Sequence, residues 1–371
     1  QALLLGLTGT TAASGTPDLG MADLGYHYAN GARSLAAIQW RDASTSALLH
    51  VDATIGNDEY TRIEAANAST PWATIRHALR QLVPGDTLII GAGVWNEAMD
   101  IRVSDVTVLG SDSLGSTTLK PDSRRDAIRV RAARVEIRNL AIDGGRRGIS
   151  LYRQAENIHL QDLSITNVRS DGITLRGNPG VTIDSVTLSG CRRTGIYGVR
   201  ATEVLIRNVQ VTACLRGGIG MSRSSGLIEF VTIQGAGRTG ISLRRSPDLE
   251  FRDSIVTGHA GWGVHMRARA GEASSLHHLL LGNNRMDIYP QSAASSPDIL
   301  TNSDPLYRDP EGPDGIAGGI GWADDDLSLS LGSPAIDKGS DEASALGVDQ
   351  TSTQAKHGAP DTGIADLGVH Q

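Results

Sequence analysis

A repeat of 22–24 residues fills the middle of the chain and limits the folds that are open to it. Gly-Ile or Gly-Val pairs recur at steps of 24, 23, 23, 22 and 23 residues, beginning at Gly148, Gly172, Gly195, Gly218, Gly240 and Gly263. Three apolar columns advance in phase with them, starting at Ile137, Leu140 and Ile142. Apolar and polar residues alternate within each segment, which predicts short strands with one buried face.

Strands this short cannot bury their inner faces alone. Three of them per repeat, stacked coil on coil at about 4.8 Å per step, would enclose a continuous apolar column. The leucine-rich repeat has a similar period, but its signature is absent, and a propeller needs blades of about 40 residues. The scarcity of bulky rings (two Phe) and the 44 Gly suit thin stacked strands with many turns. The sequence therefore predicts an all-β parallel β-helix of about 22–24 residues per coil.

An open stack exposes unpaired strand edges, so both ends need covering. Residues 70–82 predict a short N-terminal capping helix, with Pro71 in its first turn and with Ile75, Leu79 and Leu82 on one face. Pro84 and Gly85 would end this helix. Residues 327–336, with the tail, are expected to cap the other end.

Motifs at both ends of the repeat resemble bacterial secreted right-handed parallel β-helix proteins of the pectate-lyase-like superfamily. They are Val51-Asp52, Pro71-Trp-Ala-Thr-Ile75, Pro84-Gly-Asp-Thr87, Gly91-Ala-Gly-Val94, Asp304-Pro-Leu-Tyr307 and Gly332-Ser-Pro-Ala-Ile-Asp337. The resemblance implies a right-handed β-helix in a secreted or cell-surface protein whose export signal lies upstream of this segment. That superfamily includes lyases, hydrolases, epimerases, adhesins and passive surface proteins, so the resemblance names no activity.

The two ends of the chain also match each other. Aligned without a gap, residues 1–28 are identical to residues 344–371 at 14 of 28 positions. The simplest explanation is one unit, plus an overlap, of a tandem array. We therefore expect the tail of a preceding unit and a linker at 1–47, the β-helix with its N-terminal cap at 48–300, and an acidic closing region at 301–371.

Charge is distributed unevenly. Residues 124–269 contain 23 Arg, no Lys and 12 acidic residues, whereas the remainder has 11 basic and 29 acidic residues. The arginines recur just before and just after one strand of each coil, so stacking would place them in two rows at the margins of one sheet. The predicted polyanion-binding residues are Arg153, Arg176, Arg193, Arg200, Arg216, Arg223, Arg238, Arg245 and Arg267 with Tyr197.

Two interpretations of these arginines remain open. They can form a groove for an acidic polysaccharide, because the guanidinium fork binds carboxylate or sulfate. They can also lie along a solvated, ion-paired surface. The outward line Ser150, Thr174, Tyr197, Gly220, Ser242 and His265 has too few rings for nucleic acid.

The main functional prediction is a structural or adhesive β-helix domain that binds acidic polysaccharide. The alternatives are a polysaccharide lyase or epimerase acting on uronate polymers, and a self-assembling subunit that contacts neighbouring copies of itself. The central coils contain no lysine base, no carboxylate cluster for calcium and no paired-aspartate motif for hydrolysis. Tyr197 with Arg200 or Arg223, or His265 with Arg267, could serve a lyase that needs no metal.

Metal and thiol chemistry give weaker signals. Asp309, Asp314, Asp324 and Asp326 supply hard oxygens near Gly-rich turns and suggest Ca²⁺, and no organic cofactor is expected. His277 and His278 are neighbours on a predicted strand, so their rings should point apart. Cys191 and Cys214 are 23 residues apart and should stack as buried free thiols, with a disulfide as the alternative. No apolar run approaches the roughly 18 residues of a membrane span.

Overall fold

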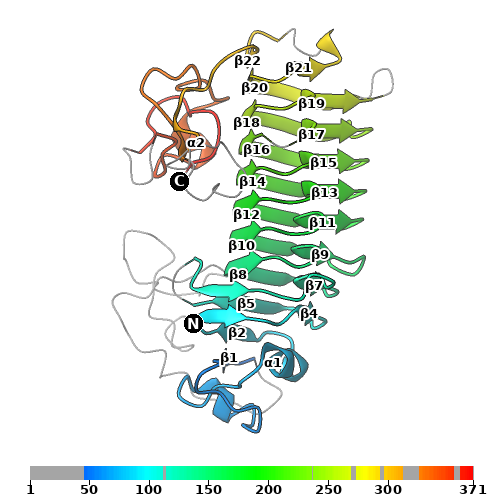
Figure 1. The fold of residues 1–371 in the computed structure, drawn as a ribbon, viewed down its shortest axis with the longest axis vertical. Helices are drawn as coiled ribbons and strands as arrows, with labels where there is room; N and C mark the ends of the chain where they lie inside the picture. The colour runs from blue at the N-terminus through cyan, green and yellow to red at the C-terminus, as the bar shows by residue number, and fades with distance from the viewer. Residues whose placement is uncertain are drawn as a thin grey trace, which may run out of the picture. The chain divides into compact units, whose positions relative to one another are not determined.

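The computed structural model describes residues 46–111, 114–235, 237–268, 273–292, 296–311, 326–354 and 360–370. Within them the chain forms a right-handed parallel β-helix, as predicted, with two sheets running along the stack (Figure 1). The predicted 1–47 unit, which includes the N-terminal half of the tail match, lies almost entirely outside the described residues. The described helices are too short to cross a membrane.

A 13-stranded sheet and a nine-stranded sheet form the walls. The first contains β1 (Leu48–Val51), β2 (Thr87–Ile90), β3 (Gly93–Trp95), β5 (Val106–Gly110), β6 (Thr117–Leu119), β8 (Val135–Asp143), β10 (Ile158–Thr166), β12 (Val181–Ser189), β14 (Val204–Thr212), β16 (Gly226–Gln234), β18 (Leu249–Thr257), β20 (Ser275–Gly282) and β22 (Ile299–Leu300). The second contains β4 (Met99–Ile101), β7 (Ile128–Val130), β9 (Ile149–Leu151), β11 (Ile173–Arg176), β13 (Thr194–Val199), β15 (Gly217–Ser222), β17 (Thr239–Arg244), β19 (Trp262–Arg267) and β21 (Met286–Tyr289).

The strand register follows the sequence repeat. Ile173, Ile196, Ile219, Ile241 and Val264 pair in succession from β11 to β19 and are all buried. The columns that begin at Ile137, Leu140 and Ile142 pair in the same way along the 13-stranded sheet. These columns join in one continuous core, so the apolar positions of the repeat are the inside of the tube.

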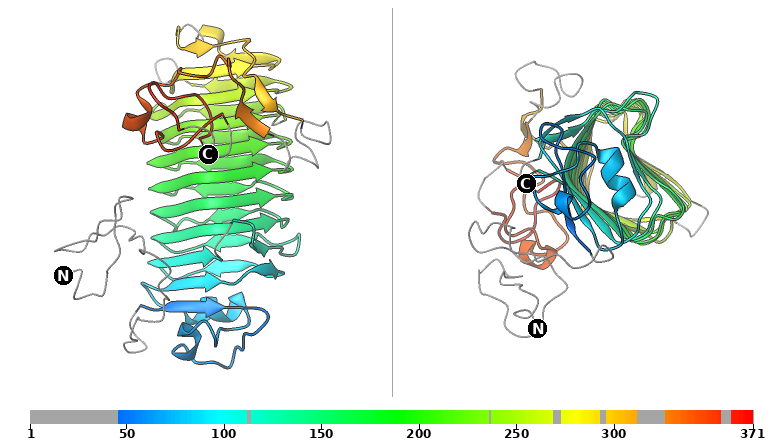
Figure 2. Two further views of the ribbon diagram at one scale, coloured as in Figure 1. Left: turned by 90° about the vertical axis from the view of Figure 1, so that its left-hand side faces the viewer. Right: turned by 90° about the horizontal axis from the view of Figure 1, so that it is seen from below.

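The coils have two strands rather than the predicted three. Each long strand from β8 to β20 turns at one residue with a left-handed backbone: Asn139, Asp162, Ser185, Asn208, Phe230, Asp253 and His278, with φ between 49° and 57°. This residue joins two of the predicted short strands and turns the chain around a corner. The end-on view in Figure 2 shows the resulting closed wall around the core.

The N-terminal helix exists but begins later than predicted. Helix α1 spans Ile75–Gln81, and the Thr74 side chain caps it by accepting a 3.1 Å hydrogen bond from the His77 amide. Pro71 therefore precedes the helix, because the next residue, Trp72, is used in a bridge to Val51. Ile75 is fully buried, and α1 lies at the N-terminal end of the stack (Figure 1). A 3-10 turn, Glu64–Ala66, precedes it.

The C-terminal segment does not cap the end of the stack, contrary to the prediction for residues 327–336. Residues 326–354 and 360–370, called here the closing segment, include β24 (Asp326–Leu329), which pairs antiparallel with β23 (Tyr307–Asp309), and α2 (Ala343–Leu346). Leu329 and Leu367 pack on Ile255 and Leu280, and Val348 packs on Phe230. The closing segment therefore covers the outer face of the 13-stranded sheet beside β14–β20 (Figures 1 and 2).

The two cysteines are free and buried, as predicted. They belong to neighbouring coils and both lie in the core. The interaction with the Cys214 thiol, together with burial, raises the pKa of Cys191 well above its usual value. Both thiols therefore act as small apolar core residues.

Candidate functional site

The outer face of the nine-stranded sheet carries an ordered column of side chains. Ser150, Thr174, Tyr197, Gly220, Ser242 and His265 are Cα partners in succession, as the repeat predicted. Tyr197 is 40% exposed, whereas His265 is only 8% exposed, so the column is open in its middle and covered near β19. Gly220, beside Tyr197, leaves the sheet surface low at that point.

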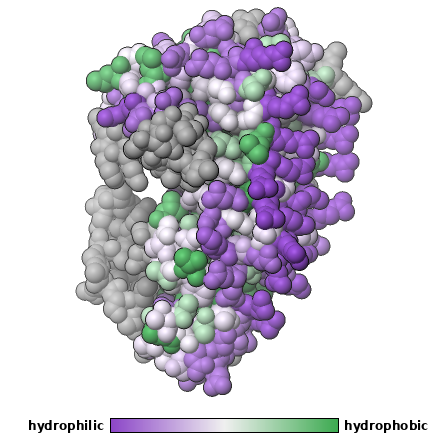
Figure 3. All heavy atoms as spheres, viewed as in Figure 1, coloured by the Kyte–Doolittle hydropathy of each residue, from purple (hydrophilic) through white to green (hydrophobic). Residues whose placement is uncertain are grey.

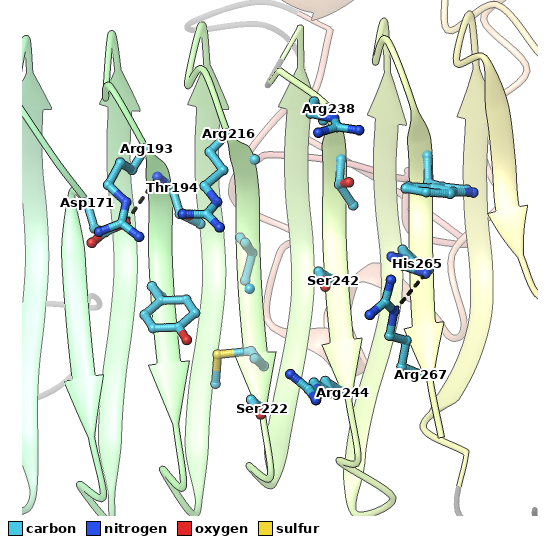
Figure 4. A pocket seen from close by; sticks show the side chains of 17 residues that line it. Asp171, Arg193, Thr194, Arg216, Ser222, Arg238, Ser242, Arg244, His265 and Arg267 are labelled. Carbon is cyan, nitrogen blue, oxygen red and sulfur yellow. Dashed lines mark hydrogen bonds between the residues drawn. The ribbon is translucent and has the colours of Figure 1, made fainter. Parts of the chain in front are cut away.

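A groove of about 520 Å³ lies over this face between β13 and β19 (Figure 4). Its charged and aromatic lining is Asp171, Arg193, Tyr197, Arg216, Arg238, Arg244, Trp262, His265 and Arg267. Backbone and small side chains such as Gly217, Thr239 and Ser242 form its floor. We call it the first groove.

The guanidinium groups around the first groove lack carboxylate partners in the part of the chain that the structure describes. Among the described residues, no carboxylate oxygen lies within 4.0 Å of Arg193, Arg216, Arg238, Arg244 or Arg267. The Asp171 side chain, at one end, instead accepts a 3.2 Å hydrogen bond from the Thr194 amide. Like charges about 5 Å apart repel by roughly 1 kcal/mol even in water, so an anion over this face would relieve real repulsion.

A second groove of about 620 Å³ continues along the sheet over β9–β13. Arg147, Tyr152, Arg153, Arg176 and Arg200 line it, and Tyr197 stands between the two grooves. The Arg131 guanidinium stacks over the Tyr152 ring at 3.9 Å. The predicted residues are therefore divided between two neighbouring grooves, and Arg223 and Arg245 line neither.

The arginines do not form two unbroken rows. On the downstream margin Arg176, Arg244 and Arg267 occupy the last strand position, but Val199 and Ser222 fill that position in the coils between them. Arg200, Arg223 and Arg245 stand one residue later, in turns where each has a left-handed φ of 50–55°. Figure 3 shows the resulting hydrophilic band along the edge where the strands end.

Rings gather at one end of the first groove. Trp262 stacks on His265 with ring centroids 4.3 Å apart, and Tyr289 meets His265 edge-on at 5.4 Å. Arg267 Nε donates to His265 Nε2 at 3.3 Å (Figure 4). Burial, and then the Arg267 charge, lower the pKa of His265, so this imidazole is neutral near pH 7. Trp262 was missed by the sequence analysis because it stands two residues before inward Val264, so strict alternation would place it inside, whereas the structure places it in the groove.

The two candidate catalytic rings cannot act on one bond. Tyr197 and His265 are three strands apart in the same column, which separates them by about 14 Å at the usual strand spacing. His265 and Arg267 are hydrogen-bonded in the structure, whereas no hydrogen bond or cation–π pair joins Tyr197 to Arg200 or Arg223 among the described residues. Any proton transfer in the first groove would therefore centre on His265.

The predicted metal ligands are only partly described. Asp309 and Asp326 are Cα partners across β23 and β24, while Asp314 and Asp324 lie outside the described residues. The Ca²⁺ site therefore stays a prediction. The expectation that His277 and His278 point apart is wrong: their ring centroids are 5.5 Å apart, because the left-handed turn at His278 breaks the alternation.

The fold and its outward face define a parallel β-helix whose arginine-rich sheet is grooved. The chain belongs to the family described as the right-handed beta helix region, which matches residues 95–285. No curated protein matches the sequence.

Solved structures with similar folds include an alginate lyase from Paenibacillus sp. str. FPU-7 (16% identity, 58% of this chain and 92% of that chain, TM-score 0.43). A rhamnogalacturonan lyase (10%, 77% and 97%, 0.38) and pectate lyase Pel9A (10%, 88% and 98%, 0.38) are also similar. These are likenesses of fold.

Proposed function

We propose that this chain is a structural or adhesive domain of a secreted or cell-surface protein, and that it binds acidic polysaccharide on its nine-stranded sheet. The observation that carries the proposal is the set of guanidinium groups around the first groove, for which the described residues supply no carboxylate partner. Guanidinium forks bind carboxylate and sulfate through paired hydrogen bonds. An uncovered surplus of them selects a polyanion over a neutral glycan.

The shape of the face also supports a polymer. The first groove crosses four strands, β13 to β19, so it is roughly 14–20 Å long at the usual strand spacing, and the second groove extends it. Trp262, stacked on one side by His265, offers a ring at the groove end against which a sugar can pack. Nucleic acid is the less favoured polyanion, since it would need a longer series of stacking rings.

The test is salt-dependent retention on immobilised alginate and heparin. Arg216→Ala with Arg238→Ala should weaken binding about tenfold, since exposed ion pairs contribute about 0.2–1 kcal/mol each and these two flank one groove. The matched control is Arg192→Ala with Arg285→Ala, which removes the same charge from exposed arginines that line neither groove. Equal loss in both double variants would reduce the effect to net charge, and no retention at low salt would overturn the proposal.

A lyase or epimerase acting on uronates is the second candidate, favoured by the neutral His265 in an arginine-lined groove. Arg267 would turn from His265 Nε2 to the uronate carboxylate and offset its charge, which frees the Nε2 lone pair to remove the adjacent proton. Incubation with alginate, pectate and glycosaminoglycans tests this by the ultraviolet absorbance of unsaturated products and by NMR of epimerised sugars. Product formation that is lost in His265→Asn would establish an enzyme and would overturn the proposal of a structural or adhesive domain.

A further inference from the structure

Two histidines and an aspartate meet where the last coils of the 13-stranded sheet approach the closing segment. His277 and His278 belong to β20, and Asp298 directly precedes β22. One nitrogen of each ring and one oxygen of Asp298 all lie within 4.8 Å of one another, and all three residues are half-buried. This cluster is on a different sheet from both grooves.

The turn in β20 brings the rings together. Consecutive residues of a straight strand face opposite sides of the sheet. His278 instead takes the left-handed conformation, with a φ of 52°, at the corner position that Asp253 occupies one coil earlier. The two rings consequently meet edge to face, with an angle of 83° between their planes.

The hydrogen-bond partners of His278 fix which of its nitrogens is free. Its Nδ1 is 3.0 Å from the Lys338 carbonyl oxygen, which can only accept, so Nδ1 carries the proton. In the neutral ring Nε2 then keeps its lone pair and faces Asp298 Oδ2 at 3.6 Å. That separation is too long for a hydrogen bond. It is close to the roughly 3.4 Å between two ligands that are each about 2.0–2.1 Å from one tetrahedral ion.

His277 is held in a similar way. Its Nε2 is 2.9 Å from Glu250 Oε1, an acceptor, so this nitrogen donates and Nδ1 is left with a lone pair. Metal-binding histidines usually donate their other ring nitrogen to a carboxylate or a carbonyl, which orients the ring and raises its basicity. Both rings therefore have the outer partners that a metal site requires.

The surrounding charge favours a cation. Arg252 is the Cα partner of His277, but its guanidinium is held by Glu229 at 2.8 Å and lies near Glu250 and Asp253. Three carboxylates thus surround one guanidinium. In addition, Asp298 Oδ1 is buried and makes no hydrogen bond to a described residue.

We propose that His277, His278 and Asp298 bind Zn²⁺ or a similar transition-metal dication. Two imidazoles and one carboxylate suit such an ion, whereas Ca²⁺ prefers oxygen ligands throughout. The ion would join β20 to the segment before β22. Through the hydrogen bond from His278 to Lys338, it would also hold the closing segment against the sheet.

The test is a titration of the metal-free full chain with ZnCl₂. Calorimetry measures the Zn²⁺ affinity, and thermal unfolding measures the change in melting temperature. His278→Asn suits the left-handed backbone, and Asp298→Asn can still accept the 3.2 Å hydrogen bond from the His278 amide, so both variants should fold. Each should lower Zn²⁺ affinity at least tenfold and remove the rise in melting temperature that Zn²⁺ produces in the unaltered chain.

His159→Gln is the matched control, because His159 lies on the same sheet with Glu136 at 3.6 Å but belongs to no three-ligand cluster. It should leave Zn²⁺ affinity unchanged. The proposal is overturned if the unaltered chain takes up no Zn²⁺, or if the His278 and Asp298 variants bind it as tightly as the control does. In that case His278 and Asp298 form a simple ion pair.

Discussion

The same repeat builds both sheets and both carry arginines, but the arginines differ in their ion pairing. On the 13-stranded sheet Arg207 and Arg252 reach Glu229, at 3.9 and 2.8 Å, and Arg138 pairs with Glu136. On the nine-stranded sheet the arginines of the first groove have no such partner among the described residues. These arginines of the 13-stranded sheet are therefore ion-paired, whereas the first groove of the nine-stranded sheet keeps an uncompensated positive charge among the described residues.

The nine-stranded sheet itself changes along the stack. Near its N-terminal end Arg131 and Arg146 pair with Asp100 and Asp126, both at distances of 3.0 Å or less. The strands from β13 to β19 contain no Asp or Glu, while arginines continue at their margins. The two ends of the nine-stranded sheet therefore differ in charge balance although the same repeat builds both.

The outer faces of the two sheets also differ in how far other parts of the chain pack on them. Ile255 and Leu280 point outward on the 13-stranded sheet but are at most 1% exposed, because the closing segment lies on them. Leu280→Ala should cost about 2–5 kcal/mol, the usual range for a buried leucine, as measured by urea unfolding. Tyr197→Ala, outward on the other sheet, should change stability by no more than about 0.5 kcal/mol. Similar losses in both variants would erase the distinction between a covered and an open face.

Removing an arginine should also change the free energy of unfolding differently on the two sheets. Arg252→Ala leaves Glu229 buried without its closest partner, and burial already raises the pKa of this carboxyl. We expect a loss of about 1–3 kcal/mol in the free energy of unfolding. Arg216→Ala should be neutral or slightly stabilising at low salt, since it relieves repulsion. Adding Glu229→Gln to Arg252→Ala should restore much of the loss; if it does not, packing of the Arg252 side chain is responsible.

Most of the wall could be predicted from sequence because burial repeats with every coil. Periodicity alone places the columns that begin at Ile137, Leu140 and Ile142 inside the tube. Because these columns pair from coil to coil, they also give the strand register. The closing segment was misplaced because its contacts are not periodic. One signal was nevertheless present in an outward column of the 13-stranded sheet. Its residues are polar at Thr187, Gln210 and Thr232 and then apolar at Ile255 and Leu280, where the closing segment packs on the sheet.

The sites were harder to predict than the wall for two physical reasons. Trp262 has the parity of inward Val264, so period-two reasoning would place it inside the tube, and only the structure shows that it lines the first groove. The meeting of His277 and His278 depends on one left-handed residue. Asn139 and Asp162 favour this conformation by residue type, but Ser185 and Phe230 occupy the same corner in other coils, so residue type alone did not identify it at His278.

We expect a smaller, pH-dependent contribution to folding stability from the closing segment. Burial raises the pKa of Asp361, in the closing segment, to about 6. A carboxyl whose pKa is higher in the folded state than in the unfolded state binds its proton more tightly when folded. Its contribution is therefore present below about pH 4 and is lost as pH rises through 6.

Asp361→Asn mimics the protonated form and can still accept the 2.8 Å hydrogen bond from the Asp366 amide. The variant should be about 1–2 kcal/mol more stable than the parent at pH 7, and this gain should vanish at pH 4. Exposed Asp341→Asn is the control and should show no gain at either pH. A gain that persists at pH 4 would trace the effect to packing rather than to charge. Retention on alginate should be equal for all three proteins, because the cover and the grooved face are on different sheets.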